Sequence, residues 1–205
     1  MPLVRPYRPS DLDALYGICL QTGDAGQDAT ALYRDPKLLG QVYAAPYAVL
    51  EPESCFVVED DVGIGGYIVG TRDTHGFEKR QLRGWWPALR AGLADPGEDG
   101  ASADGDARMA YLIHHPARTP RRINEPYPAH LHINCLPRLQ GMGMGKRLLD
   151  TWLAAMAQAG ATAAHLGVGP RNARAVRFYK AYGFHLIEQL PPPWDTCWFG
   201  ISTGR

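Results

Sequence analysis

The feature that most constrains this chain is the glycine-rich segment 140–146, which reads Gln-Gly-Met-Gly-Met-Gly-Lys. It follows a run typical of a β-strand, 129–136, and precedes a run typical of an amphipathic helix, about 144–159. Glycines let a backbone approach a ligand closely, and the start of a helix presents free N–H groups and a positive dipole end. The segment therefore predicts a phosphate-binding site.

Spacing excludes two common phosphate-binding loops. A P-loop reads G-x-x-x-x-G-K followed by Ser or Thr, but here Gln140 stands at the first glycine position and Arg147 follows Lys146. A dinucleotide fingerprint reads G-x-G-x-x-G, and its third glycine would fall on Lys146 or Leu148. The pattern that remains is Q-x-x-G-x-G, beginning at Gln140.

This pattern resembles the coenzyme A pyrophosphate loop of the GNAT superfamily of N-acetyltransferases. A second segment, 172–184, is similar to the superfamily's other signature, N-x-x-A-x-x-F-Y-x-x-x-G-F. The two signatures occur in the expected order. The chain is therefore identified as resembling a GNAT acetyltransferase, with acetyl-coenzyme A as the implied cofactor.

A further resemblance covers nearly the whole length. Segments around Arg5, Cys55, Gly65 and Gly70 look like the acetyltransferase-like C-terminal domain of animal O-GlcNAcases. That animal domain has lost the glycine loop and is regarded as a pseudo-acetyltransferase. This chain keeps the loop, so the resemblance favours cofactor binding here.

Hydrophobic patterning predicts strands and helices in the order β-α-α-β-β-insertion-β-α-β-α-β-β. We expect an α/β (α+β) fold with a mixed, mostly antiparallel sheet, helices on both faces, and one splayed parallel pair, 129–136 with 163–168. Residues 1–205 are predicted to form a single domain. The segment around 91–107, rich in Gly, Ala and Asp, is expected to be a flexible insertion.

Local signals place further elements. Ser10 is predicted to cap a helix, a second helix to cover 37–43, and the prolines at 191–193 to separate the last two strands. Trp85 and Trp86 are interpreted as core or dimer-interface residues in preference to a lid over the acceptor site.

Charge and cysteine content narrow the class of protein. Lys plus Arg and Asp plus Glu both number 21, which argues against nucleic acid or an anionic membrane as the main partner. The four cysteines are scattered without a C-x-x-C pair, so free thiols are expected rather than a disulfide or metal site. No apolar run of membrane-spanning length or signal-peptide core occurs, and a cytoplasmic location is expected.

The resemblance implies a set of cofactor contacts along the strand, the loop and the second signature. These are Asn134, Cys135, Leu136, Gln140, Gly141, Met142, Gly143, Met144, Gly145, Lys146, Asn172, Phe178 and Tyr179. Asn172 is equally well interpreted as the cap of the helix that follows it. A thioester is already activated, so no metal is expected.

Acetyl transfer to an amine requires an acid and a base. In the family the tyrosine of the Phe-Tyr pair, here Tyr179, protonates the departing thiolate, and a phenol stays protonated at neutral pH. For the base, His132 shares a strand face with His130, and Asp73 follows another strand; Asp195 is a more distant candidate. Each histidine is equally well interpreted as a hydrogen-bonded residue of the sheet surface, and Asp73 as a turn residue.

We therefore expect an acetyl-coenzyme A-dependent N-acetyltransferase that acts on a primary amine of a small molecule or peptide by direct attack in a ternary complex, as a monomer or homodimer. The alternative is a binding module without turnover, like the pseudo-acetyltransferase domain. A third hypothesis is a glycan- or peptide-recognition module built on the Trp-rich segment.

Overall fold

The computed structural model describes residues 1–101, 103, 105–191 and 195–204. Its centre is a seven-stranded sheet in the order β1-β2-β3-β4-β5-β7-β6. The strands are β1 (Leu3–Pro6), β2 (Phe56–Asp60), β3 (Gly63–Thr71), β4 (Ala129–Cys135), β5 (Ala163–Val168), β6 (His185–Gln189) and β7 (Cys197–Ser202).

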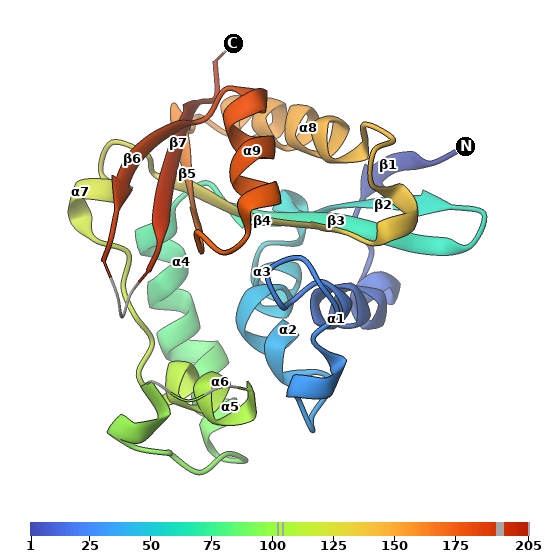
Figure 1. Ribbon diagram of the computed structural model, residues 1–205. Coiled ribbons are helices and arrows are strands. Elements are labelled where there is room, and N and C mark those ends of the chain that lie inside the picture. Colours follow the sequence, from blue (N-terminus) through green and yellow to red (C-terminus); the bar gives the residue numbers. More distant parts are fainter. Residues whose placement is uncertain (102, 104, 192–194, 205) are drawn as a thin grey trace.

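The sheet consists of two antiparallel parts joined by a short parallel contact. Strands β1 to β4 pair antiparallel, as do β5, β7 and β6. Between the parts, β4 and β5 run parallel and pair only at Ala129 with Ala164 and at His130 with His165. Beyond these pairs the strands separate, and Figure 1 shows β5, β6 and β7 turned away from β3 and β4. The predicted mixed sheet with a splayed parallel pair is confirmed.

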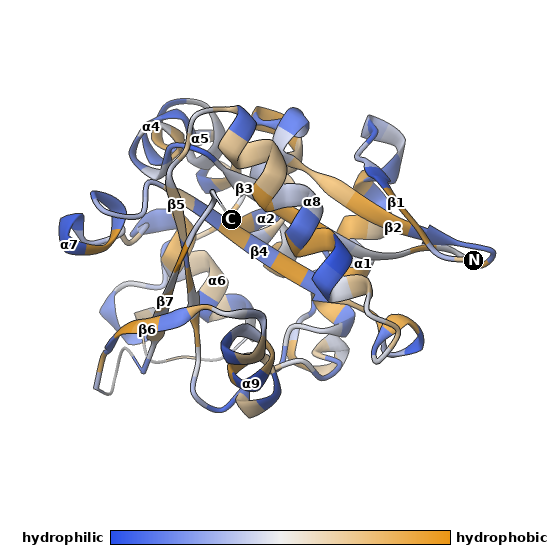
Figure 2. Cartoon of the chain, turned by 90° about the horizontal axis from the view of Figure 1, so that it is seen from above, coloured by the Kyte–Doolittle hydropathy of each residue, from blue (hydrophilic) through white to orange (hydrophobic). Residues whose placement is uncertain are grey.

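Helices cover both faces of the sheet, as expected. They are α1 (Leu12–Gln21), α2 (Leu38–Tyr43), α3 (Ala45–Leu50), α4 (Thr74–Arg80), α5 (Trp86–Arg90), α6 (Gly105–His114), α7 (Arg121–Asn124), α8 (Met144–Gln158) and α9 (Ala173–Tyr182). One hydrophobic cluster joins α8 and α9 to one face, and a second joins α1 to α6 to the other. In Figure 2 the central strands carry much of the hydrophobic colour.

Helix α8 anchors the glycine-rich segment to the core. Its apolar stripe is fully or nearly fully buried, and Trp152 Nε1 donates a hydrogen bond to Ser54 O at 3.1 Å. Truncating a buried Trp of this kind costs about 3–5 kcal/mol of folding free energy. Because α8 is held this firmly, the position of its first turn, and of the loop before it, is well defined.

One local prediction near the N-terminus was wrong. Ser10 does not cap α1; it lies inside a 3-10 turn, Pro9–Asp11, and α1 begins only at Leu12. Asp11 accepts hydrogen bonds from Arg8 N and from the Arg5 guanidinium. The helix predicted at 37–43 is present as α2, and a further helix, α3, follows it with Pro46 in its first turn, where proline is tolerated.

The segment around 91–107 is more regular than expected. A 3-10 turn covers Glu98–Ala101, and α6 begins at Gly105 and buries Met109, Ala110 and Ile113. The short apolar face of α6 is preceded by glycines and aspartates, which hide its period in the sequence. The proline-rich break expected at 191–193 lies partly outside the described residues.

Candidate active site

A cavity of about 380 Å³ lies where β4 and β5 separate, and we call it the loop cavity. Its wall combines β4, the glycine-rich segment, the first turn of α8, one side of α9 and the loop after α1. The lining residues are Thr22, Gly26, Ile133, Asn134, Cys135, Leu139, Gln140, Gly141, Gly143, Met144, Gly145, Lys146, Asn172, Arg174, Ala175, Phe178 and Tyr179.

The glycine-rich segment takes a shape that only glycine adopts easily. Gly141 and Gly143 have φ of 76° and 75°, in the left-handed region, and Gly143 is the residue from which α8 begins. Gly145 packs so closely on Phe178 that a Cβ would approach its Cζ to 3.1 Å. The first N–H groups of α8 lack acceptors within the helix, so they are available to an anion in the loop cavity.

Gln140 fixes the loop to its surroundings. Its Nε2 donates to Cys135 O at 2.8 Å, and its Oε1 accepts from the guanidinium of Arg174. Gln140 therefore joins the loop to β4 and to α9. Arg174 and Lys146 both line the cavity and add positive charge beside the helix N-terminus.

The open edge of β4 differs from the prediction at one residue. Leu136 N donates to Gly65 O at 2.8 Å, so Leu136 faces β3 and does not line the cavity. Because backbone groups alternate along a strand, those of Ile133 and Cys135 point the other way, toward the separation from β5. Ile133 thus replaces Leu136 at the edge, a register that the sequence alone does not reveal.

Most of the other expected contacts do surround the loop cavity. Asn172 lines it and also caps α9, because its Oδ1 accepts from Ala175 N at 3.1 Å, so both interpretations of this residue fit the geometry. Met142 is 52% exposed and lies outside the lining. Thr22 and Arg174 were not expected to line the cavity: Thr22 follows α1, far from the loop in sequence, and Arg174 lies two residues after the predicted contact Asn172.

Tyr179 has a buried ring and an open hydroxyl. The residue is 8% exposed and packs on Phe178, Phe184 and Phe199. In the described part of the chain, the buried polar side-chain atoms without a partner are Tyr67 Oη and Trp198 Nε1. Tyr179 Oη also has no hydrogen-bond partner among the described residues, but it is not one of these buried atoms. Because Tyr179 lines the loop cavity, its hydroxyl is open to that cavity. Burial raises the pKa of Tyr179, which keeps the phenol protonated.

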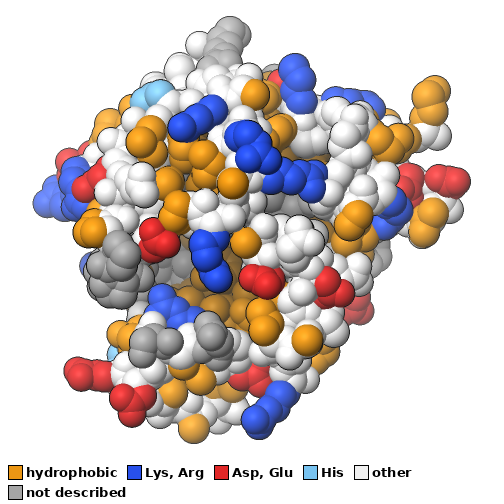
Figure 3. All heavy atoms as spheres, viewed as in Figure 1, with side chains coloured by type: hydrophobic (Ala, Val, Ile, Leu, Met, Phe, Trp, Pro, Cys, Tyr) orange, Lys and Arg blue, Asp and Glu red, His pale blue; other side chains and the backbone are white. Residues whose placement is uncertain are grey.

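A second cavity, of about 780 Å³, lies further along β4 between its histidines and helices α2 to α6; we call it the histidine cavity. His130, His132 and His165 line it together with aromatic side chains, among them Tyr47 and Trp198. Glu78, Arg108, Arg118 and Arg122 contribute charged groups. Figure 3 shows this side of the molecule hollowed, with hydrophobic side chains inside and Lys or Arg side chains at the edge.

The histidines of this cavity are neutral at neutral pH. Burial, reinforced by the neighbouring imidazoles, lowers the pKa of His130 well below its ordinary value. The same causes lower the pKa of His132 to about 4. Tyr47 Oη lies between the two rings, 2.7 Å from His130 Nε2 and 3.1 Å from His132 Nε2.

Comparison with known proteins places this geometry in a family. A model of the acetyltransferase (GNAT) family matches residues 103–184. The crystal structure of SsHAT is 38% identical in sequence, covers 100% of this chain and 99% of its own, and superimposes with a TM-score of 0.89. The chain belongs to the acetyltransferase (GNAT) family.

Other relatives of this GNAT chain are more distant. Protein O-GlcNAcase of Rattus norvegicus is 25% identical over 200 residues, which are 97% of this chain and 22% of that protein. The chain thus spans about a fifth of the length of this curated relative. The yncA protein of Salmonella typhimurium, whose structure contains acetyl-CoA, shares the fold at 14% identity, with a TM-score of 0.58 and coverage of 100% of this chain and 95% of its own.

Family membership confirms the expected fold and acetyl-coenzyme A as the cofactor. The site fits this cofactor: the helix start, Lys146 and Arg174 suit a pyrophosphate, and the open edge at Ile133 and Cys135 suits an amide-containing arm. No helix in the described part of this GNAT chain has the length and apolarity needed to cross a membrane.

Two candidate acids or bases lie away from these cavities in the GNAT chain. The carboxylate of Asp73 caps α4 by accepting from Gly76 N at 3.0 Å, and the residue is exposed. Neither Asp73 nor Asp195 lines the loop cavity or the histidine cavity.

Trp86 does line the histidine cavity, whereas Trp85 Nε1 donates to Gln41 O at 2.9 Å.

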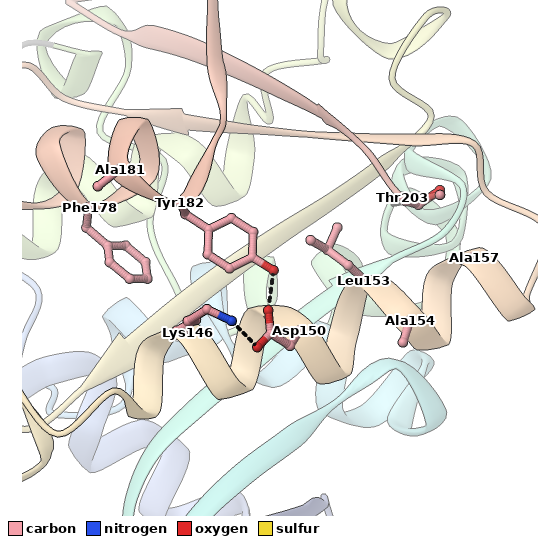
Figure 4. A pocket seen from close by; sticks show the side chains of 10 residues that line it. Lys146, Asp150, Leu153, Ala154, Ala157, Phe178, Ala181, Tyr182 and Thr203 are labelled. Atoms are coloured by element: carbon pink, nitrogen blue, oxygen red, sulfur yellow. Dashed lines mark hydrogen bonds and ion pairs between the residues drawn. The ribbon is translucent and has the colours of Figure 1, made fainter.

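A third hollow of this GNAT chain lies between α8 and α9, beside the end of β7 (Figure 4). Here Asp150 holds two partners, Lys146 Nζ at 2.7 Å and the hydroxyl of Tyr182 at 2.7 Å. Lys146 therefore stands between the hollow and the loop cavity, and its ammonium is paired with a carboxylate.

Proposed function

We propose that this chain transfers the acetyl group of acetyl-coenzyme A to a primary amine by direct attack in a ternary complex. The observation that carries the proposal is the arrangement of the two cavities along β4. Residues 133–135 line the loop cavity and residues 130–132 line the histidine cavity. A thioester in one cavity and an amine in the other would meet where β4 and β5 separate.

The loop cavity binds and orients the cofactor in this proposal. The backbone N–H groups of 141–146, with Lys146 and Arg174, hold the pyrophosphate. The N–H groups at the β4 edge, Ile133 and Cys135, would pair with the pantetheine arm, and an N–H group of this edge would stabilise the oxyanion that develops on the acetyl carbonyl. When bound, the cofactor supplies an acetyl group that is already activated as a thioester.

Tyr179 supports departure of the thiolate. Its hydroxyl opens into the loop cavity, and its raised pKa means that the proton stays on oxygen until a strong acceptor forms nearby. A departing thiolate is such an acceptor, so Tyr179 stabilises it by a hydrogen bond and then by protonation. Tyr179 is therefore our proposed general acid.

The histidine cavity receives the amine. Lysine-like amines have a pKa of about 10.4, so at neutral pH a proton must leave before attack. The neutral imidazole of His132 can accept one, whereas Asp73 lies outside the cavity. The volume of about 780 Å³ suits a small molecule or the side chain and flanking groups of a peptide.

Two measurements on the same protein test this function. Calorimetric titration measures binding of coenzyme A, and release of free thiol from acetyl-coenzyme A is followed across a library of amines, amino acids and lysine peptides. We expect binding together with amine-dependent thiol release and an acetylated product by mass spectrometry. Binding without amine-dependent release would favour the cofactor-binding module, and absence of binding would favour the recognition module.

A further inference from the structure

The hydrogen bonds around His130 determine which of its nitrogens carries hydrogen. Thr74 Oγ1 lies 2.7 Å from Pro128 O and 2.8 Å from His130 Nδ1. A carbonyl oxygen cannot donate, so the single hydroxyl hydrogen of Thr74 points to Pro128 O. The hydrogen between Thr74 and His130 therefore sits on His130 Nδ1.

The same reasoning continues through Tyr47. Because the His130 ring is neutral and carries its hydrogen on Nδ1, its Nε2 is an acceptor. Tyr47 Oη, 2.7 Å away, donates its one hydrogen to that nitrogen. Tyr47 Oη must then accept from His132 Nε2 at 3.1 Å, so His132 carries its hydrogen on Nε2.

His132 Nδ1 is left with a free lone pair that faces the histidine cavity. No hydrogen bond to it is recorded in the part of the chain that the structure describes. Among the described residues, the buried side-chain N and O atoms that lack a partner are Tyr67 Oη and Trp198 Nε1. His132 Nδ1 lacks a partner and is not one of these buried atoms, so it is accessible. His132 lines the cavity that we assign to the amine.

We propose that His132 Nδ1 takes the proton of the acceptor amine, and that Thr74, His130 and Tyr47 are positioning residues that hold His132 in its Nε2–H form. This inference rests on the proposed acetyl transfer. The hydrogen bonds link Thr74 at the start of α4 to His130 of β4, His130 to Tyr47 of α3, and Tyr47 back to His132 of β4.

The proton and electron balance is complete. An amine N–H bond breaks and an Nδ1–H bond forms on His132, and the freed pair of the amine nitrogen bonds to the acetyl carbon. The C–S bond breaks with its electrons on sulfur, and Tyr179 Oη gives its proton to the thiolate. The nitrogen, which entered as an ammonium and lost one proton to His132, gives up its second proton to the Tyr179 phenolate as the amide forms, and water takes the proton from His132.

Burial keeps His132 in its neutral, proton-accepting form. A pKa of about 4 keeps His132 Nδ1 unprotonated throughout the neutral range. When Nδ1 takes up a proton, the ring becomes positively charged. Its Nε2–H is already bonded to Tyr47 Oη, and this oxygen stabilises the charge. The relay therefore prepares the imidazole before the amine arrives.

The tautomers can be measured without any substrate. In a long-range ¹H–¹⁵N spectrum of the ¹⁵N-histidine-labelled protein at neutral pH, we expect His130 in the Nδ1–H form and His132 in the Nε2–H form, assigned with single His→Gln variants. In Tyr47→Phe and Thr74→Val, we expect the His132 signals to shift toward a mixture of tautomers. Wild-type His132 in the Nδ1–H form would overturn the relay.

Kinetics test the base itself. In His132→Gln, the amide nitrogen can still reach Tyr47 Oη but the basic lone pair is gone, so we expect kcat to fall by about 10²–10⁴-fold while the Kd for coenzyme A is unchanged. In Tyr47→Phe, kcat should fall by a smaller factor with the KM for acetyl-coenzyme A unchanged. His185→Gln is the matched control, because His185 is exposed and bonds Tyr127 Oη outside both cavities.

The outcomes separate the inference from the function. If wild type acetylates an amine and His132→Gln retains its kcat, His132 is not the base, although the transferase proposal stands. If wild type shows no amine-dependent transfer, the function fails and the base with it, while the spectrum still decides the tautomers. A fall in kcat confined to His132→Gln and the relay variants supports the inference.

Discussion

Gly143 and Gly160 stand at opposite ends of α8 in the same left-handed backbone conformation, with φ of 75° and 86°. A Cβ at either position would have no heavy atom within 4 Å. An added side chain would therefore cost backbone strain alone at both sites. What differs is the surroundings, because Gly143 lines the loop cavity and Gly160 does not.

This pair gives a matched test of the phosphate cradle. Gly143→Ala and Gly160→Ala should each lower the free energy of unfolding by about 1 kcal/mol, measured by urea denaturation. Only Gly143→Ala should weaken coenzyme A binding in calorimetry, because relief of its strain moves the N–H groups of the loop. Equal affinity of the two variants would contradict the assignment of the loop.

The ion pair between Lys146 and Asp150 predicts a competition with the cofactor. Lys146→Met should weaken coenzyme A binding by about 1 kcal/mol, roughly fivefold, and the difference from wild type should shrink in high salt. Asp150→Asn removes the competing carboxylate and should tighten binding in the same assay. Weaker binding by Asp150→Asn would show that Asp150 instead holds Lys146 in place for the phosphate.

The buried imidazoles predict a loss of stability in acid. Burial lowers the pKa of His132 and of His165 to about 4 from the ordinary value of about 6.5, so the unfolded chain binds more protons between these values. Stability should be constant above about pH 6.5 and fall as the pH drops toward about 4. Thermal unfolding across this range measures the loss, and His165→Gln should reduce it; an unchanged pH dependence in that variant would exclude His165 as a contributor.

The sequence predicted the second half of the fold best. The period of α8, the β-branched and apolar runs of β4 and β5, and two signature segments are local patterns, so they are legible without tertiary structure. α6 was missed because only Met109, Ala110 and Ile113 mark its buried face. Helix α3 was not predicted, because it follows α2 directly and carries Pro46 in its first turn.

The candidate site was predictable where it is contiguous in sequence. The loop and the α9 signature place Gln140, Gly145 and Tyr179 around one cavity, as expected. Ile133, and not Leu136, lies at the open edge of β4 because of how β4 pairs with β3. This strand register determines which backbone groups point toward the cavity, and the sequence alone does not give it. Tyr47, which joins His130 to His132, comes from a helix that the sequence did not reveal.

The measurement that tests the account most directly compares Tyr179→Phe with wild type at saturating acetyl-coenzyme A and an accepted amine. Tyr182→Phe is the control, because its hydroxyl lies three residues further along α9 and bonds Asp150 in the hollow between α8 and α9. We expect Tyr179→Phe to lose about 10²-fold or more in kcat with little change in the Kd for coenzyme A, and Tyr182→Phe to keep both. Equal kcat in Tyr179→Phe and wild type would contradict acid catalysis by Tyr179 and the placement of the chemistry in the loop cavity.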